Sequence, residues 1–530
     1  MKVDNGSDSR STSPYGEPSA VDTVPRGWSA WFGGPNTTVG PRITPRVIVP
    51  VSGDTPEDSD SAMNSDAILE KQLAQEAGSA IQYRTCSWQK TAALLFSEYI
   101  CLAIMSFPWS YSILGLVPGV ILTIVQALLV LYTSLILWQF CLRHPEVRDV
   151  CDIGQMLFWN KKWAWWFTAV MFVLNNTFIQ GLHVLTGAKY VNTLIGGETD
   201  AISCQTVSIG LIVAIISWIA SLPRTFSVLS HLGTGSAVFT FVSVLLAVIF
   251  AAIESHPAGY SAEAVTDPST GKVMPSGAPI VTAIPLVTTT FVSGLNAFLN
   301  ISYTLIGQIT LPSFIAEMKE PKDFPKALWA CTIAEIIVFT IVGATVYAYT
   351  GNQYMTSPAF GSLQPIYKKV AFSFMVPTII FLGVLYASVS ARFVFLRIFH
   401  NSRHKNENTI VGWATWAGIL LVTWLLAFVI ANSIPFFSSL LSLLSSLFDS
   451  FFGFIFWGVA YFRMRKADGA VSLLRDRTFR GWFEGILNII IILTGLFFLT
   501  AGTYATIQGI IDEYEAGTVG RPFSCASNGI

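Results

Sequence analysis

Residues 97–110, SEYICLAIMSFPWS, lie in the first long apolar run of the chain and contain an acid, several small residues and a proline. Pro108 has no amide hydrogen and disfavours α-helix in the residue before it, so we expect the helix to break or kink near Met105–Phe107. Backbone groups freed inside a membrane must be satisfied by something other than lipid. The stretch therefore predicts either a proline kink packed against neighbouring helices or a broken helix that lines a site.

The composition is typical of a membrane protein. Hydrophobic residues make up 52% of it and charged residues only 12%, whereas soluble domains carry roughly a quarter charged residues. Apolar runs of about 20 residues, long enough to cross roughly 30 Å of hydrocarbon, predict an all-α polytopic membrane protein with eleven transmembrane helices. Their expected ranges are 91–114, 119–141, 163–187, 203–222, 226–252, 284–308, 327–350, 370–398, 411–432, 436–462 and 482–508.

The ends of the chain differ from this apolar part. Residues 1–87 are rich in Ser, Pro, Gly and Asp, which predicts a disordered tail without the pattern of a cleaved signal. Lys and Arg in short loops stay on the cytoplasmic side, and the outer loops would hold few of them if the N-terminus is cytoplasmic. We therefore expect a cytoplasmic tail over 1–87, a membrane domain over 88–510 and a short extracytoplasmic tail over 511–530.

A second apolar run is interrupted in the same way as the first. Before Pro312, the sixth run is interrupted by polar and small residues: Asn300, Ser302, Tyr303, Thr304, Gly307, Gln308 and Thr310. Interruptions in runs one and six are expected of a five-plus-five inverted repeat with discontinuous helices 1 and 6. The breaks in these two helices would meet near the middle of the membrane. Helix N-termini there favour an anionic group and unwound carbonyls a cation, so a zwitterion fits the site.

Three stretches also carry a resemblance to a known family. Residues 97–115, SEYICLAIMSFPWSYSILG, resemble the first-helix signature of the amino acid/auxin permease family, roughly A-E-T-x-x-L-G-x-L-S-x-P. Residues 314–328, FIAEMKEPKDFPKAL, and 144–158, HPEVRDVCDIGQMLF, are similar to two of its loops. The fungal members, which include proton-coupled permeases for neutral and aromatic amino acids, are the most similar in pattern. Ala103 departs from the family's glycine, which leaves the preferred substrate open.

The expected substrate site lies between the two breaks. From the first run it takes Ala103, Ile104, Met105 and Ser106, and from the sixth Ser302, Tyr303, Thr304 and Gly307. Asn176 and Gln180 share one helix face with His183, and this face either makes hydrogen bonds between helices or lines the substrate path.

The expected site of cation coupling centres on Glu98. A carboxyl group in an apolar run is costly unless it is neutral or paired, so Glu98 either carries a proton or has a structural role. Ser97, Ser388 and Ser390 are small hydroxyls of the kind that complete a cation site in this fold, with small-residue helix packing as the alternative. Glu335, Arg392 and Asp449 are interpreted as buried pairs or interface residues.

The sequence thus predicts a secondary amino acid transporter that works by alternating access, driven by protons rather than Na⁺ and located in the plasma membrane. A sensor that binds an amino acid, and a vacuolar exporter of the same fold, stay open as alternatives. No phosphate-binding GxxxxGK[ST], HExxH or GxSxG motif occurs, so we expect no ATP use and no enzyme activity. We also expect no cofactor, metal or nucleic-acid partner.

Overall fold

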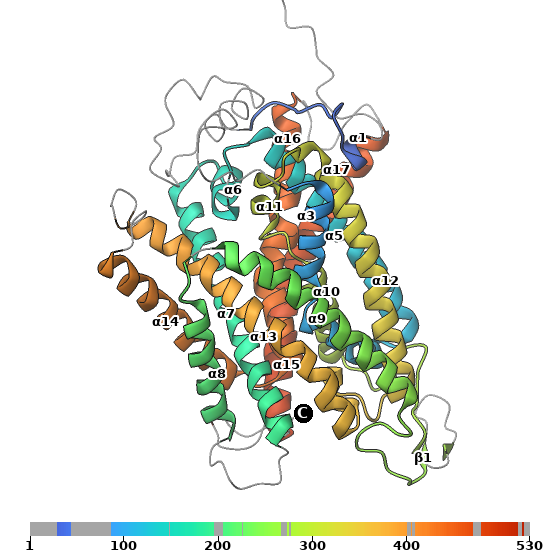
Figure 1. Ribbon diagram of the computed structural model, residues 1–530. Coiled ribbons are helices and arrows are strands. Elements are labelled where there is room, and N and C mark those ends of the chain that lie inside the picture. Colours follow the sequence, from blue (N-terminus) through green and yellow to red (C-terminus); the bar gives the residue numbers. More distant parts are fainter. Residues whose placement is uncertain are drawn as a thin grey trace, which may run out of the picture.

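Long helices make up most of the protein (Figure 1). The computed structural model describes residues 29–43, 86–147, 149–195, 205–224, 226–266, 273–274, 277–399, 404, 409–469, 479–517 and 522–523. Within them, the elements up to the first strand pair are α1 (Ser29–Phe32), α3 (Trp88–Tyr99), η2 (Leu102–Ser106), α4 (Phe107–Leu114), α5 (Leu116–Arg143), α6 (Val150–Leu157), α7 (Lys162–Ile195), α8 (Gln205–Ser221), α9 (Phe226–Ile253), β1 (Val265–Thr266) and β2 (Val273–Met274).

The second half of the chain is helical as well. Its elements are α10 (Phe291–Leu305), α11 (Leu311–Ala316), η4 (Pro321–Asp323), α12 (Phe324–Thr350), η5 (Ala359–Ser362), α13 (Pro365–Ile398), α14 (Ile410–Ser433), α15 (Phe437–Leu444), η7 (Ser445–Ile455), α16 (Phe456–Ala467), α17 (Phe479–Phe497), η8 (Phe498–Gly502) and α18 (Thr503–Glu515). The two strands form one antiparallel pair, in which Val265 lies opposite Met274.

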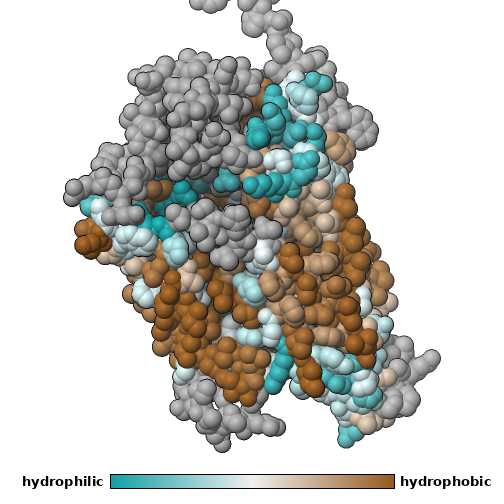
Figure 2. Space-filling model, viewed as in Figure 1, coloured by the Kyte–Doolittle hydropathy of each residue, from teal (hydrophilic) through white to brown (hydrophobic). Residues whose placement is uncertain are grey.

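The helices form an integral, multi-pass membrane protein. In the described part, eight helical stretches are long and apolar enough to cross a membrane, and nine if the bent pair of α3 with η2–α4 counts as one span. Figure 2 shows hydrophobic residues over the sides of the bundle and hydrophilic residues toward its ends, as lipid contact requires. Each of the eleven predicted apolar runs contains a helix, but eleven crossings and the inverted repeat stay predictions.

The first membrane helix is broken, at a point earlier than the sequence predicts. Regular α-helix stops after Tyr99, Cys101 is extended at φ −128° and ψ −179°, and Leu102–Ser106 form a 3₁₀ turn before α4. The two parts meet at 47°. Pro108 lies in the first turn of α4, where its missing N–H costs nothing and its fixed φ suits a helix start. The proline therefore marks where the helix resumes, and the interruption reaches back to Ile100.

The sixth apolar run is broken as well. Helix α10 ends at Leu305, Ile306 is extended at φ −97° and ψ 111°, and α11 begins at Leu311 with Pro312 in its first turn. Residues 306–310 connect the two helices without regular helical structure. The two broken helices are in contact, because α10 packs against both α4 and η2.

One long span contains a feature that the sequence did not predict. The span Phe437–Ala467 is α-helical at both ends but π-helical over Ser445–Ile455, the element η7. A π-helical stretch changes the direction of its side chains and is frequent at functional sites.

Part of the predicted tail lies against the bundle. Residues 29–43, here called the docked segment, run across one end of it, beside α12 (Figure 1). The indole of Trp329 donates a hydrogen bond to the carbonyl of Trp31 at 2.9 Å, and Phe32 stacks on Trp329 with ring centroids 5.4 Å apart. Gly34 donates its N–H to the carbonyl of Lys322. The expected disorder therefore does not extend to these residues, because Phe32 and the carbonyl of Trp31 find partners on α12 and the ring of Trp31 packs near Tyr132 of α5. The rest of 1–85 lies outside the described residues.

Candidate functional site

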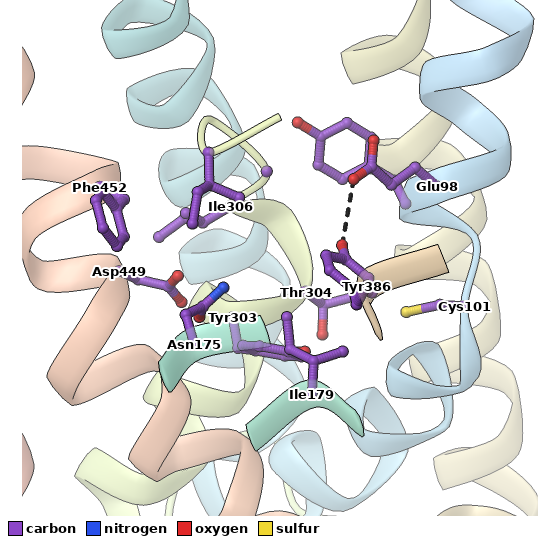
Figure 3. A pocket seen from close by; sticks show the side chains of 13 residues that line it. Glu98, Cys101, Asn175, Ile179, Tyr303, Thr304, Ile306, Tyr386, Asp449 and Phe452 are labelled. Carbon is purple, nitrogen blue, oxygen red and sulfur yellow. Dashed lines mark hydrogen bonds between the residues drawn. The ribbon is translucent and has the colours of Figure 1, made fainter. Parts of the chain in front are cut away.

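A cavity of about 50 Å³ lies where the two broken helices meet (Figure 3). One water molecule needs about 10–15 Å³ of such volume, so the cavity has room for a few waters. It is lined from four sides, by α3 and the first break, by α10 and the second break, by α7 with α13, and by η7. The lining residues are Glu98, Tyr99, Cys101, Asn175, Ile179, Tyr303, Thr304, Ile306, Gly307, Ile309, Tyr386, Asp449 and Phe452.

Glu98 connects three elements at this cavity. The hydroxyl of Tyr386 on α13 lies 3.2 Å from its Oε1 (Figure 3), and the hydroxyl of Thr310 lies 3.2 Å from its Oε2. Thr310 also lies 2.9 Å from the carbonyl oxygen of Gly307. The carboxyl group of the first broken helix is thus hydrogen-bonded to the second break and to α13.

A glycine lets the two breaks approach closely. A Cβ placed on Gly307 would lie 2.6 Å from Cε1 and Cζ of Tyr99, closer than real Cβ atoms come. Tyr99 is buried on α3, with 6% of its surface exposed, so the ring has little space to withdraw. Glycine at 307 is therefore a packing requirement of this site.

Of the ten residues predicted to bind substrate, Tyr303, Thr304 and Gly307 line the cavity. Ala103, Ile104, Met105 and Ser106 are buried in η2, next to the cavity residue Cys101. On the α10 side, the hydroxyl of Ser302 accepts a hydrogen bond from Gln126 of α5 at 2.7 Å.

The polar face of α7 lies against α13. Asn176 donates to the hydroxyl of Ser390 at 3.0 Å, and Gln180 donates to the carbonyl of Asn176. The cavity is lined instead by Asn175 and Ile179, which lie on the neighbouring face of the same helix. The contact with Ser390 places Asn176 between α7 and α13, whereas the hydrogen bond of Gln180 stays within α7.

The residues predicted to couple a cation have different surroundings. Glu98 lines the cavity, whereas Ser97 donates its hydroxyl to the carbonyl of Leu94 within its own helix, at 2.7 Å. Ser390 accepts from Asn176, and the buried hydroxyl of Ser388 has no hydrogen-bond partner within the described residues.

Sequence reasoning missed several lining residues. Asn175 and Ile179 are one position away from the polar face that it selected, and Tyr386 begins the stretch YASVS that holds Ser388 and Ser390. Asp449, expected to be part of a buried pair or an interface, lines the cavity. Glu335, treated in the same way, is buried in α12 and accepts from the thiol of Cys331 at 3.0 Å.

Comparison with known proteins identifies the family. The family model described as transmembrane amino acid transporter protein matches residues 84–508. The chain is 32% identical over 460 residues to the N amino acid transport system protein of Neurospora crassa, covering 87% of this chain and 92% of that protein. It is 30% identical over 485 residues to a transmembrane transporter of Gibberella moniliformis, covering 91% and 95%.

A transmembrane transporter of Fusarium pseudograminearum is also 30% identical, over 463 residues that cover 86% of this chain and 90% of that one. These fungal relatives and the matching family are transporters and not enzymes. The helical bundle, with its long apolar helices, agrees with a transmembrane transporter. The chain belongs to the transmembrane amino acid transporter family.

Proposed function

We propose that this protein is a proton-coupled symporter of neutral and aromatic amino acids that works by alternating access. The observation that carries the proposal is the position of Glu98, an ionisable group at the cavity between two broken membrane helices. Family membership supports amino acids as the substrate class, and the printed name of the Neurospora relative agrees with it.

The hydrogen bonds of Glu98 suit both of its protonation states. A hydroxyl has one proton and two lone pairs. When Glu98 is ionised, Thr310 and Tyr386 donate to it; when it is protonated, it can donate to Thr310, which then donates to the carbonyl of Gly307. Binding a proton at Glu98 therefore changes a hydrogen bond to the second break without leaving a group unpaired.

Substrate binding requires the cavity to enlarge. A cavity with space for a few waters does not hold an amino acid, so this conformation has no room for the substrate at the site. We propose that the breaks move apart and expose Ala103, Ile104, Met105 and Ser106 beside Tyr303, Thr304 and Gly307. Ser97, Ser388, Ser390, Asn176 and Gln180 would then support the site or line the path.

The proposal includes a topology and a membrane. We propose eleven spans arranged as a five-plus-five inverted repeat. The distribution of Lys and Arg in the loops supports a cytoplasmic N-terminus. The plasma membrane is the proposed location, and a vacuolar exporter or an amino acid sensor with the same fold are the competing proposals.

Uptake in transport-deficient cells tests the function. Labelled leucine and phenylalanine should accumulate, unlabelled neutral amino acids should compete, and a protonophore should remove accumulation. Binding without flux would identify a sensor, and accumulation that resists the protonophore but requires Na⁺ would contradict proton coupling.

A further inference from the structure

The cavity contains a second carboxyl group, opposite Glu98. Asp449 belongs to the π-helical element η7 and lines the same cavity as Glu98, Tyr303 and Asn175. Figure 3 shows Asp449 and Asn175 on one side of the cavity and Glu98 on the other. Asp449 has only 7% of its surface exposed, so it is buried in the middle of a membrane span.

The two carboxyl groups differ in their partners. Both oxygens of Glu98 have a hydroxyl within 3.2 Å. In contrast, Oδ2 of Asp449 is buried without a partner at hydrogen-bond distance within the described residues, although the hydroxyl of Ser445 in the same element interacts with this carboxyl group. An unpartnered buried carboxylate oxygen is costly, so a group that enters the cavity is the natural partner of Asp449.

The charges around the cavity indicate what kind of group could pair with Asp449. No lysine, arginine or histidine is present within the set of described residues that line the cavity. Tyr303 and Phe452, which do line it, have aromatic faces that attract cations. The unpartnered carboxyl oxygen and the aromatic rings together favour a compact cation that can also donate hydrogen bonds.

An amino acid carries such a group, its α-ammonium. We propose that Asp449 binds the ammonium group of the transported amino acid and thereby rejects analogues that lack a charged amine. The inference rests on the proposed function, since it takes an amino acid as the ligand. The unwound carbonyls of the two breaks would present only dipoles to the ammonium, whereas an ionised Asp449 would contribute a full negative charge. Charge-assisted hydrogen bonds are roughly twice as strong as neutral ones.

Equilibrium binding to the purified full-length protein tests this assignment. The probes are labelled leucine, with unlabelled leucine and 2-hydroxy-4-methylpentanoate as competitors, because the hydroxy acid keeps the carboxylate and side chain but lacks the ammonium. Wild type should bind leucine at least tenfold more tightly than the hydroxy acid. Asp449→Asn should bind leucine at least tenfold more weakly and bind the two compounds about equally.

The control is Ser450→Ala in the same π-helical stretch. Ser450 donates its hydroxyl to the carbonyl of Leu447 and is absent from the cavity lining, so this variant should keep the leucine preference. If Asp449→Asn does not fold, Asp449→Ser tests the same expectation. The preference is a ratio measured within one variant, so a smaller active fraction does not change it.

Three different results would contradict either the role of Asp449 or the proposed function itself. Wild-type affinity and preference in Asp449→Asn would overturn the inference and leave the proposed function intact. Unchanged binding with lost pH dependence of uptake would identify Asp449 as a proton site and also overturn it. Failure of wild type to bind leucine or phenylalanine would remove the proposed function itself.

Discussion

Glu98 is the residue on which the proposed coupling depends. Glu98→Gln keeps the shape of the side chain but fixes it in an uncharged state, so accumulation against a gradient should fall to the background while exchange of internal for external substrate survives. Both activities are measured at matched protein level and across external pH. If the variant still accumulates substrate in a pH-dependent way, Glu98 is not the coupling group. Glu335 and His183 are then the next candidates.

Gly307 tests the close packing at the second break. Gly307→Ala places a methyl group 2.6 Å from two ring atoms of the buried Tyr99, and forcing in such a group typically costs about 1–3 kcal/mol. We expect a lower melting temperature and reduced transport. Gly418→Ala on α14 is the control, because a Cβ there meets nothing within 4 Å. Equal melting temperatures for the two variants would contradict this packing.

At the scale of elements, the sequence predicted the helices better than their interruptions. Apolar length is a local property, so each predicted run contains a helix. Pro108 and Pro312 predicted two breaks, but a proline shows where a helix can resume and not where the preceding one stops, and the first interruption begins at Ile100. The π-helical element η7, which contains the cavity residue Asp449, was not predicted from the local sequence pattern.

The docked segment should add to the stability of the helical bundle. Removing residues 1–28 should leave the melting temperature unchanged, whereas removing 1–43 should lower it by a few degrees. The longer truncation takes away the Phe32 ring that stacks on Trp329 and the Trp31 carbonyl that accepts its hydrogen bond. An aromatic pair of this kind contributes about 0.5–1.5 kcal/mol beyond its buried area. Identical melting temperatures for the two truncations would show that the segment adds no stability.

Docking of the same segment should depend on pH through His144. Its Nε2 accepts a hydrogen bond from the N–H of Ile43 at 3.1 Å, and its Nδ1 lies 3.1 Å from Glu146, which also pairs with Arg42. Burial lowers the pKa of His144 below its usual value, in opposition to Glu146 and with a smaller contribution from Arg42 and Arg143. The docked state therefore favours neutral His144.

The sign of the pH effect follows from that shift. The stabilisation is full above the pKa of about 6.5 of an exposed histidine and is lost as pH falls below it. Hydrogen exchange, corrected for the intrinsic rate, should show residues 29–43 less protected at pH 5 than at pH 7.5, with α12 as the internal control. Equal protection at both pH values would disprove the pH dependence.

For the whole molecule, composition was sufficient to predict a helical membrane protein, and short motifs were sufficient for its family. The residues around the cavity were less predictable, because the helix face that points inward depends on how α7 packs against α13. Asn176 was selected from the sequence, but Asn175 lines the cavity. A difference of one residue changes the direction of a helical side chain by about 100°.

The proposed orientation of the two chain ends can be tested with epitope tags. If the plasma membrane is the location, an epitope tag before Met1 should be inaccessible to antibody in intact cells, and one after Ile530 should be accessible. Lys and Arg retention on the cytoplasmic side is the physical reason. Surface labelling of the N-terminal tag would reverse the proposed orientation.

Proton-coupled symport, as proposed for this protein, requires that the amino acid and the proton enter together. Purified protein in sealed liposomes with a pH-sensitive dye inside tests it directly, after neutral amino acid is added outside without any ion gradient. We expect the interior to acidify only when the amino acid is added, and we expect no such acidification with Glu98→Gln. Amino acid uptake by wild type without acidification would contradict proton coupling.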